Sequence, residues 1–272
     1  RLHFESNLSK SFDLSDSIFI AVGTPTNSRD NSANLIYVYK VIEEIVSLIN
    51  IKNKPKLIVT KSTVPVGTGQ EIIKFISNLR PELKLYDHFD IASNPEFLRE
   101  GSAIEDFMRP DRVVCGVESE FAKEIMQKLY RPLNLRETPI LFTGRETAEL
   151  IKYASNGFLA TKISFINEIS DICEKVGADV QQVAKGIGLD GRIGSKFLHP
   201  GPGFGGSCFP KDTRALAEIG KKYKARSRII ESVIDINENR KLNMVKKVQD
   251  AIGNLKNKSI SILGLTFKQN TD

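Results

Sequence analysis

The chain has 272 residues, of which 40% are hydrophobic and 26% are charged, and this composition is typical of a globular protein. No stretch approaches the roughly 18 consecutive apolar residues of a membrane span, and the first residues lack the apolar core of a signal peptide. The net charge of +6 fits either an anionic ligand such as a nucleotide or a lysine-rich solvated surface. Nucleic acid is disfavoured as a partner because the sequence has no long Lys/Arg cluster and no Trp.

The first half of the sequence alternates short apolar runs with amphipathic segments. The apolar runs predict strands at 17–22, 56–60, 89–93, 112–117 and 139–143. Apolar residues spaced three and four apart predict helices at 33–50, 67–79 and 120–130. Strands that alternate with helices pair in parallel through crossovers, so this half is predicted to be a doubly wound, Rossmann-like α/β domain.

From residue 144 the pattern becomes helical. Helices are predicted at 145–177, 179–188, 211–223 and 227–254, and the segment "SISILGLTFK" (259–268) returns to a strand with a glycine turn. We therefore expect part of an α/β domain at 1–143, a helical domain at 144–254 and the start of a second α/β domain at 255–272. The missing initiator Met and the abrupt end lead us to expect a fragment of a longer protein.

The three cysteines, Cys115, Cys173 and Cys208, are odd in number and widely spaced, without a C-x-x-C pair. This spacing predicts neither a disulfide framework nor a zinc site, and it favours a reducing cytoplasm. No bound metal is expected from these residues or from the three scattered histidines.

The stretch "GPGFGGSCFPKD" (201–212) places Gly201, Gly203 and Gly206 in a G-x-G-x-x-G pattern. A dinucleotide-binding fingerprint must follow a strand and open a helix, so that the helix N-terminus meets the pyrophosphate. The preceding "GRIGSKFLHP" does not read as a strand. We therefore interpret the glycines as a pliable loop whose backbone closes over a ligand.

Cys208 follows this loop and precedes a predicted helix, with Lys211 alongside. A helix N-terminus and a nearby cation favour the thiolate, which is the nucleophilic form. The alternative is a small buried hydrophobe, and we apply that interpretation to Cys115 and Cys173.

Several motifs together resemble one family. They are "FIAVGTPT", "KSTVPVGT", "SNPEFLREGSAI", "ELIKYASNGFLATKISFINEI", "DGRIGSKFLHPGPGFGGSCFPKD" and "SILGLTFKQNTD". In this order they resemble the nucleotide-sugar 6-dehydrogenases of the UDP-glucose/GDP-mannose dehydrogenase family, and best the bacterial UDP-glucose enzymes. The resemblance covers essentially the whole chain.

The resemblance implies an N-terminal Rossmann-like domain that binds NAD, central helices that form a homodimer, and a C-terminal Rossmann-like domain that binds UDP. The family's first strand, glycine motif and helix, as well as most of its C-terminal domain, have no counterpart in this sequence. One alternative is therefore a dimerising fragment without catalytic competence. The implied reaction is the NAD-dependent, four-electron oxidation of UDP-glucose to UDP-glucuronate in the cytoplasm.

By resemblance, Cys208 is the nucleophile, because a thiohemiacetal can give up the second hydride that an aldehyde cannot and leaves a thioester. Lys152 and Asn156 lie four residues apart on one predicted helix face and match the pair that stabilises the alkoxide. Without the resemblance they would read as a surface Lys beside a helix-interior Asn.

The remaining site residues are also carried over by resemblance. Catalytic roles extend to Asp212, Glu96 and Thr63, which by themselves would read as a helix-terminal acid, a solvated carboxylate and a helix N-cap. Cofactor contacts are implied for Thr24, Pro25, Ser62, Thr63, Glu100 and Lys211. Substrate contacts are implied for Glu96, Phe97, Leu98, Arg99, Lys152, Asn156, Arg192 (from the neighbouring subunit), Phe197, Leu198, His199, Pro200, Gly201, Gly205 and Lys268.

Rival interpretations remain open at this point. GDP-mannose and UDP-N-acetyl-hexosamine dehydrogenases belong to the same class, and the part of the sequence that would distinguish the sugars is largely absent. A cysteine acyltransferase or hydrolase would need a histidine paired with Cys208, and no histidine near "GGSC" fits that role.

Overall fold

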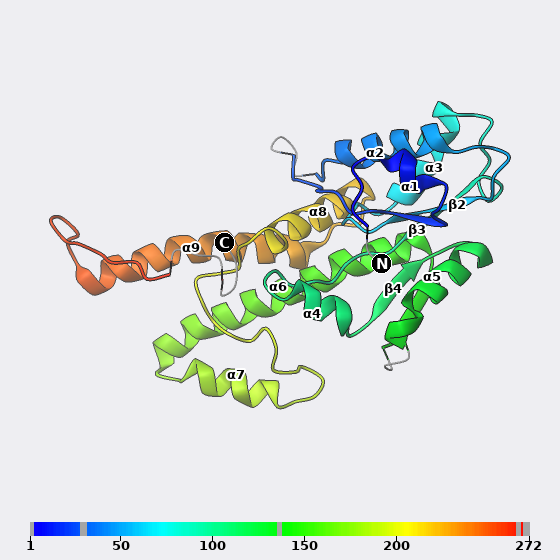
Figure 1. Ribbon diagram of the computed structural model, residues 1–272. Coiled ribbons are helices and arrows are strands. Elements are labelled where there is room, and N and C mark those ends of the chain that lie inside the picture. The colour runs from blue at the N-terminus through cyan, green and yellow to red at the C-terminus, as the bar shows by residue number, and fades with distance from the viewer. Residues whose placement is uncertain (1–2, 28–31, 135–137, 265–267, 269–272) are drawn as a thin grey trace. The chain divides into compact units, whose positions relative to one another are not determined.

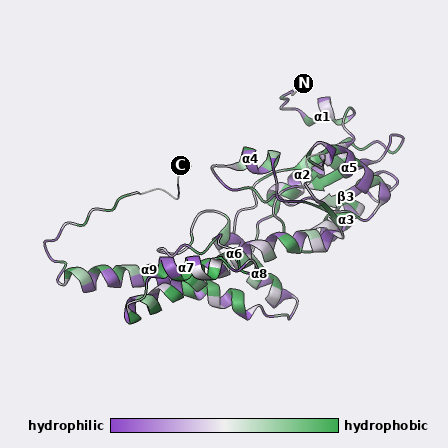
Figure 2. Ribbon diagram, turned by 90° about the horizontal axis from the view of Figure 1, so that it is seen from below, coloured by the Kyte–Doolittle hydropathy of each residue, from purple (hydrophilic) through white to green (hydrophobic). Residues whose placement is uncertain are grey.

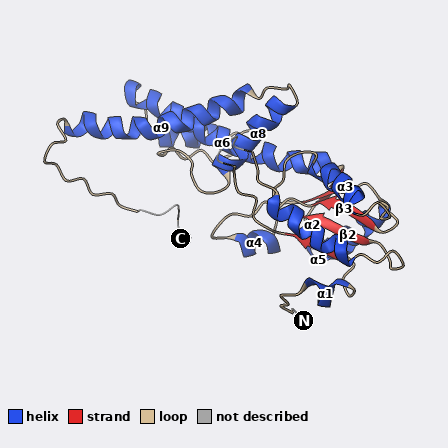
Figure 3. Cartoon of the chain, turned by 90° about the horizontal axis from the view of Figure 1, so that it is seen from above, coloured by secondary structure: helices blue, strands red, loops and turns tan. Residues whose placement is uncertain are grey.

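The computed structural model describes residues 3–27, 32–134, 138–264 and 268. The chain forms two compact units, Arg1–Lys152 and Tyr153–Asp272, and the long helix α6 (Arg145–Val176) runs through the boundary between them. Within the described residues, the strands belong to the first unit and the second is built from helices (Figure 3).

A five-stranded sheet in the order β1-β2-β3-β4-β5 forms the centre of the first unit. Its strands are β1 (Ser17–Ile20), β2 (Lys56–Thr60), β3 (Phe89–Ser93), β4 (Val113–Gly116) and β5 (Ile140–Thr143). Each lies within a predicted apolar run, so the five strand predictions are confirmed. β1, β2 and β3 pair in parallel with one another, and β4 pairs in parallel with β5.

The pairing of β3 with β4 differs from the prediction. The two strands are antiparallel and meet at the single pair Ser93↔Gly116, so the expectation of a wholly parallel sheet is wrong here. A parallel pair needs a connection that carries the chain back across the sheet, usually a packed helix. This connection contains only the short helix α4 (Ala103–Met108), which buries no residue and therefore does not act as a crossover.

Helices cover both faces of the sheet (Figure 1). Helices α2 (Ile36–Leu48) and α3 (Thr68–Leu79) pack on one face, and α5 (Glu120–Asn134) packs on the other. Strand β2 contributes side chains to the cores on both faces of the sheet. Ile58 belongs to the core with α2 and α3, whereas Leu57 and Val59 belong to the core with α5. Burial on both faces explains why this strand reads as an almost continuous apolar run.

Gly116, the last residue of β4, lies against the first turn of α6. A Cβ atom at this position would lie 2.7 Å from the Cβ of Ala148 and 2.8 Å from the Cα of Arg145. Both distances are shorter than van der Waals contact, so the first turns of α6 can approach the strand only because this residue is glycine.

The second unit continues α6 and adds α7 (Val180–Gly188), α8 (Phe209–Lys222) and α9 (Arg228–Ile252). Local sequence signals set the end of α6 and the start of α7. Gly177 has a φ of +72°, and the side chain of Asp179 accepts hydrogen bonds from the N–H groups of Gln181 and Gln182. The helices predicted in this region are confirmed.

Other elements differ from the predictions. The short helices α1 (Leu8–Phe12) and α4 were not predicted, because one or two turns are too few for a helical period to emerge. The strand expected within 259–268 is not formed by residues 259–264, and residues 265–267 lie outside the described part of the chain. Leu263 is 93% exposed, and a strand requires a neighbour to pair its backbone groups.

Within residues 3–27, 32–134 and 138–264, no helix has both the length and the apolar character that crossing a membrane requires.

Candidate functional site

Two turns at the carboxyl ends of β1 and β2 carry four of the six residues predicted to contact the cofactor, and the other two, Glu100 and Lys211, lie after β3 and on α8. The hydroxyl of Thr24 donates to the carbonyl of Thr63 (2.9 Å), and the hydroxyl of Ser62 donates to the carbonyl of Val22 (2.6 Å). The carbonyl of Pro25 accepts the N–H of Asn34 (2.7 Å). The turns are therefore joined at the sheet edge where α/β proteins bind ligands, and Thr24, Pro25, Ser62 and Thr63 are the residues that could hold a dinucleotide.

An ion pair joins Lys152 of α6 to Glu96 in the loop after β3. Lys152 is 3% exposed, and its Nζ donates to Glu96 Oε1 over 2.8 Å. The other carboxylate oxygen accepts the N–H of Leu98 (2.6 Å). A buried ammonium and a held carboxylate at one point can stabilise an oxyanion and transfer a proton.

Two cations lie close to the ring of Phe97. The guanidinium of Arg112 lies 3.7 Å from the centre of its ring, and the Nζ of Lys152 lies 5.5 Å from it. Partial burial lowers the pKa of Arg112. The sequence analysis did not identify Arg112 as a candidate site residue. The one sign of it in the sequence is that an arginine begins the apolar run "RVVCGV".

Asn94, which precedes Pro95 and Glu96, is held by a buried network. Its Nδ2 donates to the carbonyl of Val114 (2.7 Å), and its Oδ1 accepts hydrogen bonds from Lys61 Nζ (3.1 Å) and from the hydroxyl of Tyr130. Burial lowers the pKa of Lys61 to about 8, and the Glu96 carboxylate partly opposes this shift. Sequence reasoning missed Asn94, Lys61 and Tyr130, although the first two stand inside quoted motifs.

Arg99 and Glu100 follow Glu96 in the same loop, and both are exposed. The Arg99 guanidinium pairs with Asp106 of α4, with NH2 2.6 Å from Oδ1, and the Arg99 N–H donates to the same carboxylate (2.8 Å). The structure therefore directs Arg99 towards α4.

Glu149 lies three residues before Lys152 on α6 and is buried. Its carboxylate accepts the N–H groups of Gly67 (2.7 Å) and Gly69 (3.0 Å) and the hydroxyl of Ser93 (3.1 Å). It thus accepts hydrogen bonds from N–H groups at the N-terminus of α3, which begins directly after the turn that carries Thr63. Burial raises the pKa of Glu149 to about 7, although these hydrogen bonds oppose the shift.

In the second unit, Cys208 is the N-cap residue of α8. It is half-buried, and its Sγ lies 3.6 Å from the hydroxyl of Ser207. Asp212, one turn into the helix and 1% exposed, accepts a hydrogen bond from Asn156 Nδ2 (2.6 Å) and pairs with Lys211 Nζ (2.9 Å). The structure therefore brings Asn156, Asp212 and Lys211 together beside the first turn of α8.

The loop before Cys208 contains six of the fourteen predicted substrate residues. Phe197 packs edge-on against Phe209 (6.1 Å between centroids), Leu198 is buried in a core with Ile166, and His199 is exposed. Pro200 and Gly201 are half-buried and Gly205 is exposed. Residues 189–200 form no strand, so the loop lacks the strand that a dinucleotide fingerprint requires.

Arg192 and Lys268 are both exposed. The Arg192 guanidinium pairs with Asp190, two residues earlier, over 2.6 Å. In the described part of the second unit, the groups paired with Asp212 are Asn156 and Lys211, and Arg192 is not among them.

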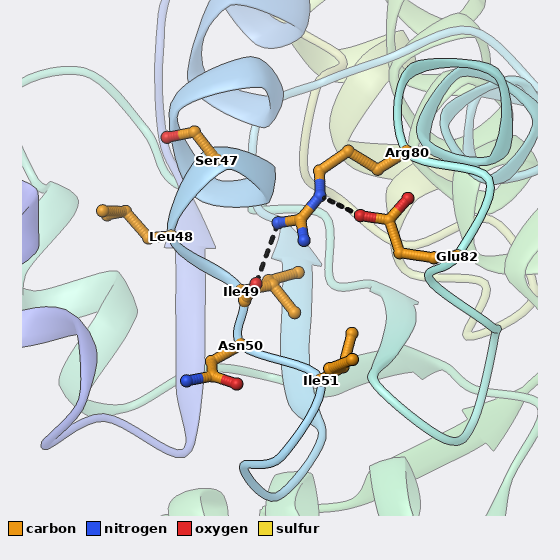
Figure 4. Close-up of a pocket in the computed structure, with 7 residues that line it drawn as sticks. All are labelled: Ser47, Leu48, Ile49, Asn50, Ile51, Arg80 and Glu82. Carbon is orange, nitrogen blue, oxygen red and sulfur yellow. Dashed lines mark hydrogen bonds and ion pairs between the residues drawn. The ribbon is translucent and has the colours of Figure 1, made fainter.

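A shallow pocket of about 480 Å³ lies on the first unit, where α2 ends (Figure 4). Arg80 bridges it by donating to the carbonyls of Val46 (2.7 Å) and Ile49 (2.8 Å) and pairing with Glu82. Its lining residues are Ser47, Leu48, Ile49, Asn50, Ile51, Arg80 and Glu82. The pocket contains none of the predicted site residues.

Comparison with known proteins places these features in context. Residues 1–134 match the NAD binding domain of the UDP-glucose/GDP-mannose dehydrogenase family, and residues 146–239 match its central domain. The whole chain is 54% identical to a UDP-glucose 6-dehydrogenase of Rhizobium meliloti (strain 1021) and spans 61% of that protein's length.

Solved structures agree in fold. A UDP-glucose dehydrogenase from the archaeon Pyrobaculum islandicum superimposes on 93% of this chain with a TM-score of 0.85 and 40% identity, and the match covers 57% of that structure. A GDP-mannose dehydrogenase from Pseudomonas aeruginosa covers 91% of the chain with a TM-score of 0.65 and 33% identity, over 56% of its own length. These proteins are therefore considerably longer than the chain described here.

Proposed function

Because the chain belongs to the UDP-glucose/GDP-mannose dehydrogenase family, we propose that it contributes the catalytic part of an NAD-dependent enzyme that oxidises UDP-glucose to UDP-glucuronate. The observation that carries the proposal is the position of Cys208 at the N-terminus of α8, four residues before a buried Asp212 that is bonded to Asn156. A thiol in this position suits a reaction with a covalent step.

The turns at the ends of β1 and β2 fit a dinucleotide. Thr24 and Thr63 are hydrogen-bonded to each other at the carboxyl edge of the sheet, and Ser62 is fixed by its hydrogen bond to the carbonyl of Val22. We propose that Thr24, Pro25, Ser62, Thr63, Glu100 and Lys211 contact NAD, which when bound accepts a hydride in each of the two oxidation steps.

Cys208 provides the covalent step. The thiolate adds to the aldehyde that the first oxidation produces, and a carbon–sulfur bond forms while the carbonyl oxygen becomes an alkoxide. Loss of the second hydride from this adduct leaves a thioester. Water then attacks the thioester carbon, the carbon–sulfur bond breaks, and the carboxylate product leaves with the thiolate regenerated.

Lys152 and Asn156 are the donors for the alkoxide. They are four residues apart on α6 and project from the same face of this helix. One of the three ammonium hydrogens of Lys152 goes to Glu96, and one of the two amide hydrogens of Asn156 goes to Asp212. Each group therefore has a further hydrogen to donate to an oxyanion.

Glu96 and Asp212 hold these donors and can carry protons. Both oxygens of Glu96 are hydrogen-bonded, so the carboxylate has a fixed orientation towards Lys152. We propose that Glu96 removes a proton from the water that hydrolyses the thioester and that Asp212 orients Asn156 and Lys211. Thr63, at the end of β2, contributes a hydroxyl for the same water.

The remaining assignments concern the sugar nucleotide. We propose that Phe97, Leu98 and Arg99 contact the sugar, as do the loop 197–201 and Gly205, with Arg192 acting in the neighbouring subunit and Lys268 in the C-terminal region. UDP-glucose is favoured over GDP-mannose because the chain is 54% and 40% identical to proteins named for UDP-glucose, against 33% for the GDP-mannose enzyme.

The proposal predicts that Cys208→Ser abolishes turnover. A chain extended at both ends to the length of its relatives should form two NADH for each UDP-glucose, and the Ser variant should lose at least about 1,000-fold in kcat, because an alcohol replaces the thiolate nucleophile. NADH absorbance measures both quantities. The same assay on the present chain shows whether the added segments are needed for turnover.

Cys173→Ser is the matched control, since Cys173 is also on a helix of the second unit but is buried. It should retain wild-type turnover. A Cys208→Ser enzyme that still forms two NADH per sugar would contradict the covalent mechanism, and NADH formation only with another nucleotide sugar would correct the substrate. Absence of NADH with every nucleotide sugar would refute the dehydrogenase assignment.

We also propose that the protein forms a homodimer through its central helices. Phe158, Phe165, Ile172 and Val176 are spaced seven, seven and four residues apart, so they lie on one face of α6, and they are between 49% and 70% exposed. Apolar and polar positions also alternate along α9 (Figure 2), where Leu242 is 69% exposed. Such an apolar face is typical of a protein interface.

Phe165→Glu is therefore expected to convert a dimer into a monomer, because a buried carboxylate without a partner strongly opposes association. Molar mass from light scattering after gel filtration measures this change. Lys175→Glu introduces the same side chain at an exposed position of α6 and should leave the dimer intact. A monomeric wild-type protein would contradict the proposal.

A cytoplasmic location completes the proposal. Cys115 and Cys173 are buried thiols outside any disulfide, which is typical of proteins from reducing compartments. NAD and nucleotide sugars are the ligands that the proposed reaction consumes there.

A further inference from the structure

The glycine-rich segment before Cys208 is held by side chains from two other helices. Asn237 of α9 is 3% exposed; its Oδ1 accepts the N–H of Phe204 (2.7 Å), and its Nδ2 donates to the carbonyl of the same residue (3.1 Å). One side-chain amide therefore satisfies both backbone groups of Phe204, as a neighbouring strand would.

Gly201 is held in the same way by two side chains. Its N–H donates to Asn167 Oδ1 on α6 (2.8 Å), and its carbonyl accepts from Arg240 Nε on α9 (2.9 Å). Arg240 is itself fixed by Asp171 and Ser170 of α6. We call Asn167, Asn237 and Arg240 the loop clamp.

Gly203 shows why this loop contains glycine. Its φ is +118°, and a Cβ atom there would lie 2.7 Å from Asn237 Oδ1. A side chain at this position would push the loop away from the clamp. The glycine thus serves close packing against Asn237, so the expectation of a pliable backbone does not hold between Gly201 and Phe204.

An aromatic contact connects the residue held by the loop clamp to the residue that follows Cys208. The ring of Phe204 packs edge-on against Phe209, with centroids 6.0 Å apart. Phe209 is the first residue of α8 and directly follows Cys208. Phe204 and Phe209 therefore flank Cys208 in the sequence and pack against each other.

We propose that Asn237 is a positioning residue for Cys208, which it fixes through Phe204 and the close approach of Gly203. The catalytic meaning of this position rests on the proposed function, whereas the geometry of the thiol can be measured without it. A displacement of a reacting group by about 1 Å can reduce turnover by about 100-fold.

The test is the alkylation rate of each cysteine by iodoacetamide, followed by peptide mass spectrometry on the chain described here. Asn237→Leu keeps the side-chain volume similar and removes both hydrogen bonds. Gly203→Ala disturbs the same contact from the loop side. Each variant should change the Cys208 rate by at least about fivefold while Cys115 and Cys173, which are buried, stay protected.

The double variant distinguishes positioning from a general loss of stability. Because both substitutions break one contact, their effects on the Cys208 rate should be far from additive. Glu238→Gln, on the exposed side of α9, is the matched control and should leave the rate unchanged. If Asn237→Leu exposes Cys115 and Cys173, it has unfolded, and Gly203→Ala then decides the test.

An unchanged Cys208 rate in a folded Gly203→Ala variant, or additive effects in the double variant, would overturn the proposal. The extended chain provides a second readout, in which Gly203→Ala should lower kcat for NADH formation at least about tenfold with little change in KM. A changed alkylation rate together with no NADH from the wild type would refute the proposed function and leave the positioning role intact.

Discussion

Lys152→Met should lower kcat for the oxidation of UDP-glucose by at least about 100-fold in the extended chain, because it removes a preorganised donor from the developing alkoxide. Methionine has a similar length and suits a position that is 3% exposed, so the fold should survive. The loss should fall mainly on kcat, since the interaction strengthens only as negative charge develops on the substrate oxygen. Initial rates of NADH formation over a range of sugar concentrations separate kcat from KM.

Lys162→Met supplies the matched control for this variant. Lys162 lies on the same helix, and its Nζ donates to the carbonyls of Ile193 (3.0 Å) and Gly194 (3.1 Å) rather than to a carboxylate. Its replacement should leave kcat within about threefold of the wild type. If Lys152→Met and Lys162→Met are equally active, Lys152 has no role in the chemistry.

Glu149 should make the first unit less stable as the pH rises from 5 to 8. Burial raises its pKa from the ordinary glutamate value of 4.5 to about 7, so the folded chain binds a proton in a range where the unfolded chain has lost it. The contribution of Glu149 to stability is therefore largest at low pH, and it is lost as the pH rises through about 7. The shift corresponds to about 3 kcal/mol of unfolding free energy.

Urea unfolding of the wild type and of Glu149→Gln at several pH values measures this effect, because the neutral amide cannot titrate. The difference in unfolding free energy between the two proteins should move against the wild type by about 3 kcal/mol between pH 5 and pH 8. Glu120→Gln, at an exposed position of α5, is the control and should parallel the wild type. A constant difference between wild type and Glu149→Gln would show that Glu149 does not titrate in this range.

The elements predicted correctly are those whose signal is local. Strands β2 and β3 coincide with the predicted residues, because helices on both faces make every position apolar or buried. The end of α6 follows from Gly177 and the start of α7 from Asp179, both of which act within one turn of the chain. The direction of β4 was predicted wrongly, because strand direction depends on the path of the connection and not on the strand itself.

The candidate site residues also fall into those with a local sequence signal and those without one. Cys208, Lys152 and Glu96 lie in distinctive sequence motifs, and these motifs were sufficient to identify them as candidate site residues. Asn237 and Arg240 were missed, because a polar residue inside a long helix gives no local sign that it reaches a loop more than 30 residues away. Sequence periodicity places such residues on a helix but does not identify what they bind.

The loop clamp also has a consequence for the order of folding. The partners of its hydrogen bonds are separated by 34, 33 and 39 residues, and no helix or turn brings them together locally. The two bonds made by Asn237 and Arg240 must therefore follow the docking of α9 on α6, which closes a long segment of chain at an entropic cost. A nascent chain that has emerged only as far as α8 already carries Cys208 and Asn167 but not Asn237 or Arg240. The thiol thus takes its final position among the last events of folding, after synthesis has passed Arg240.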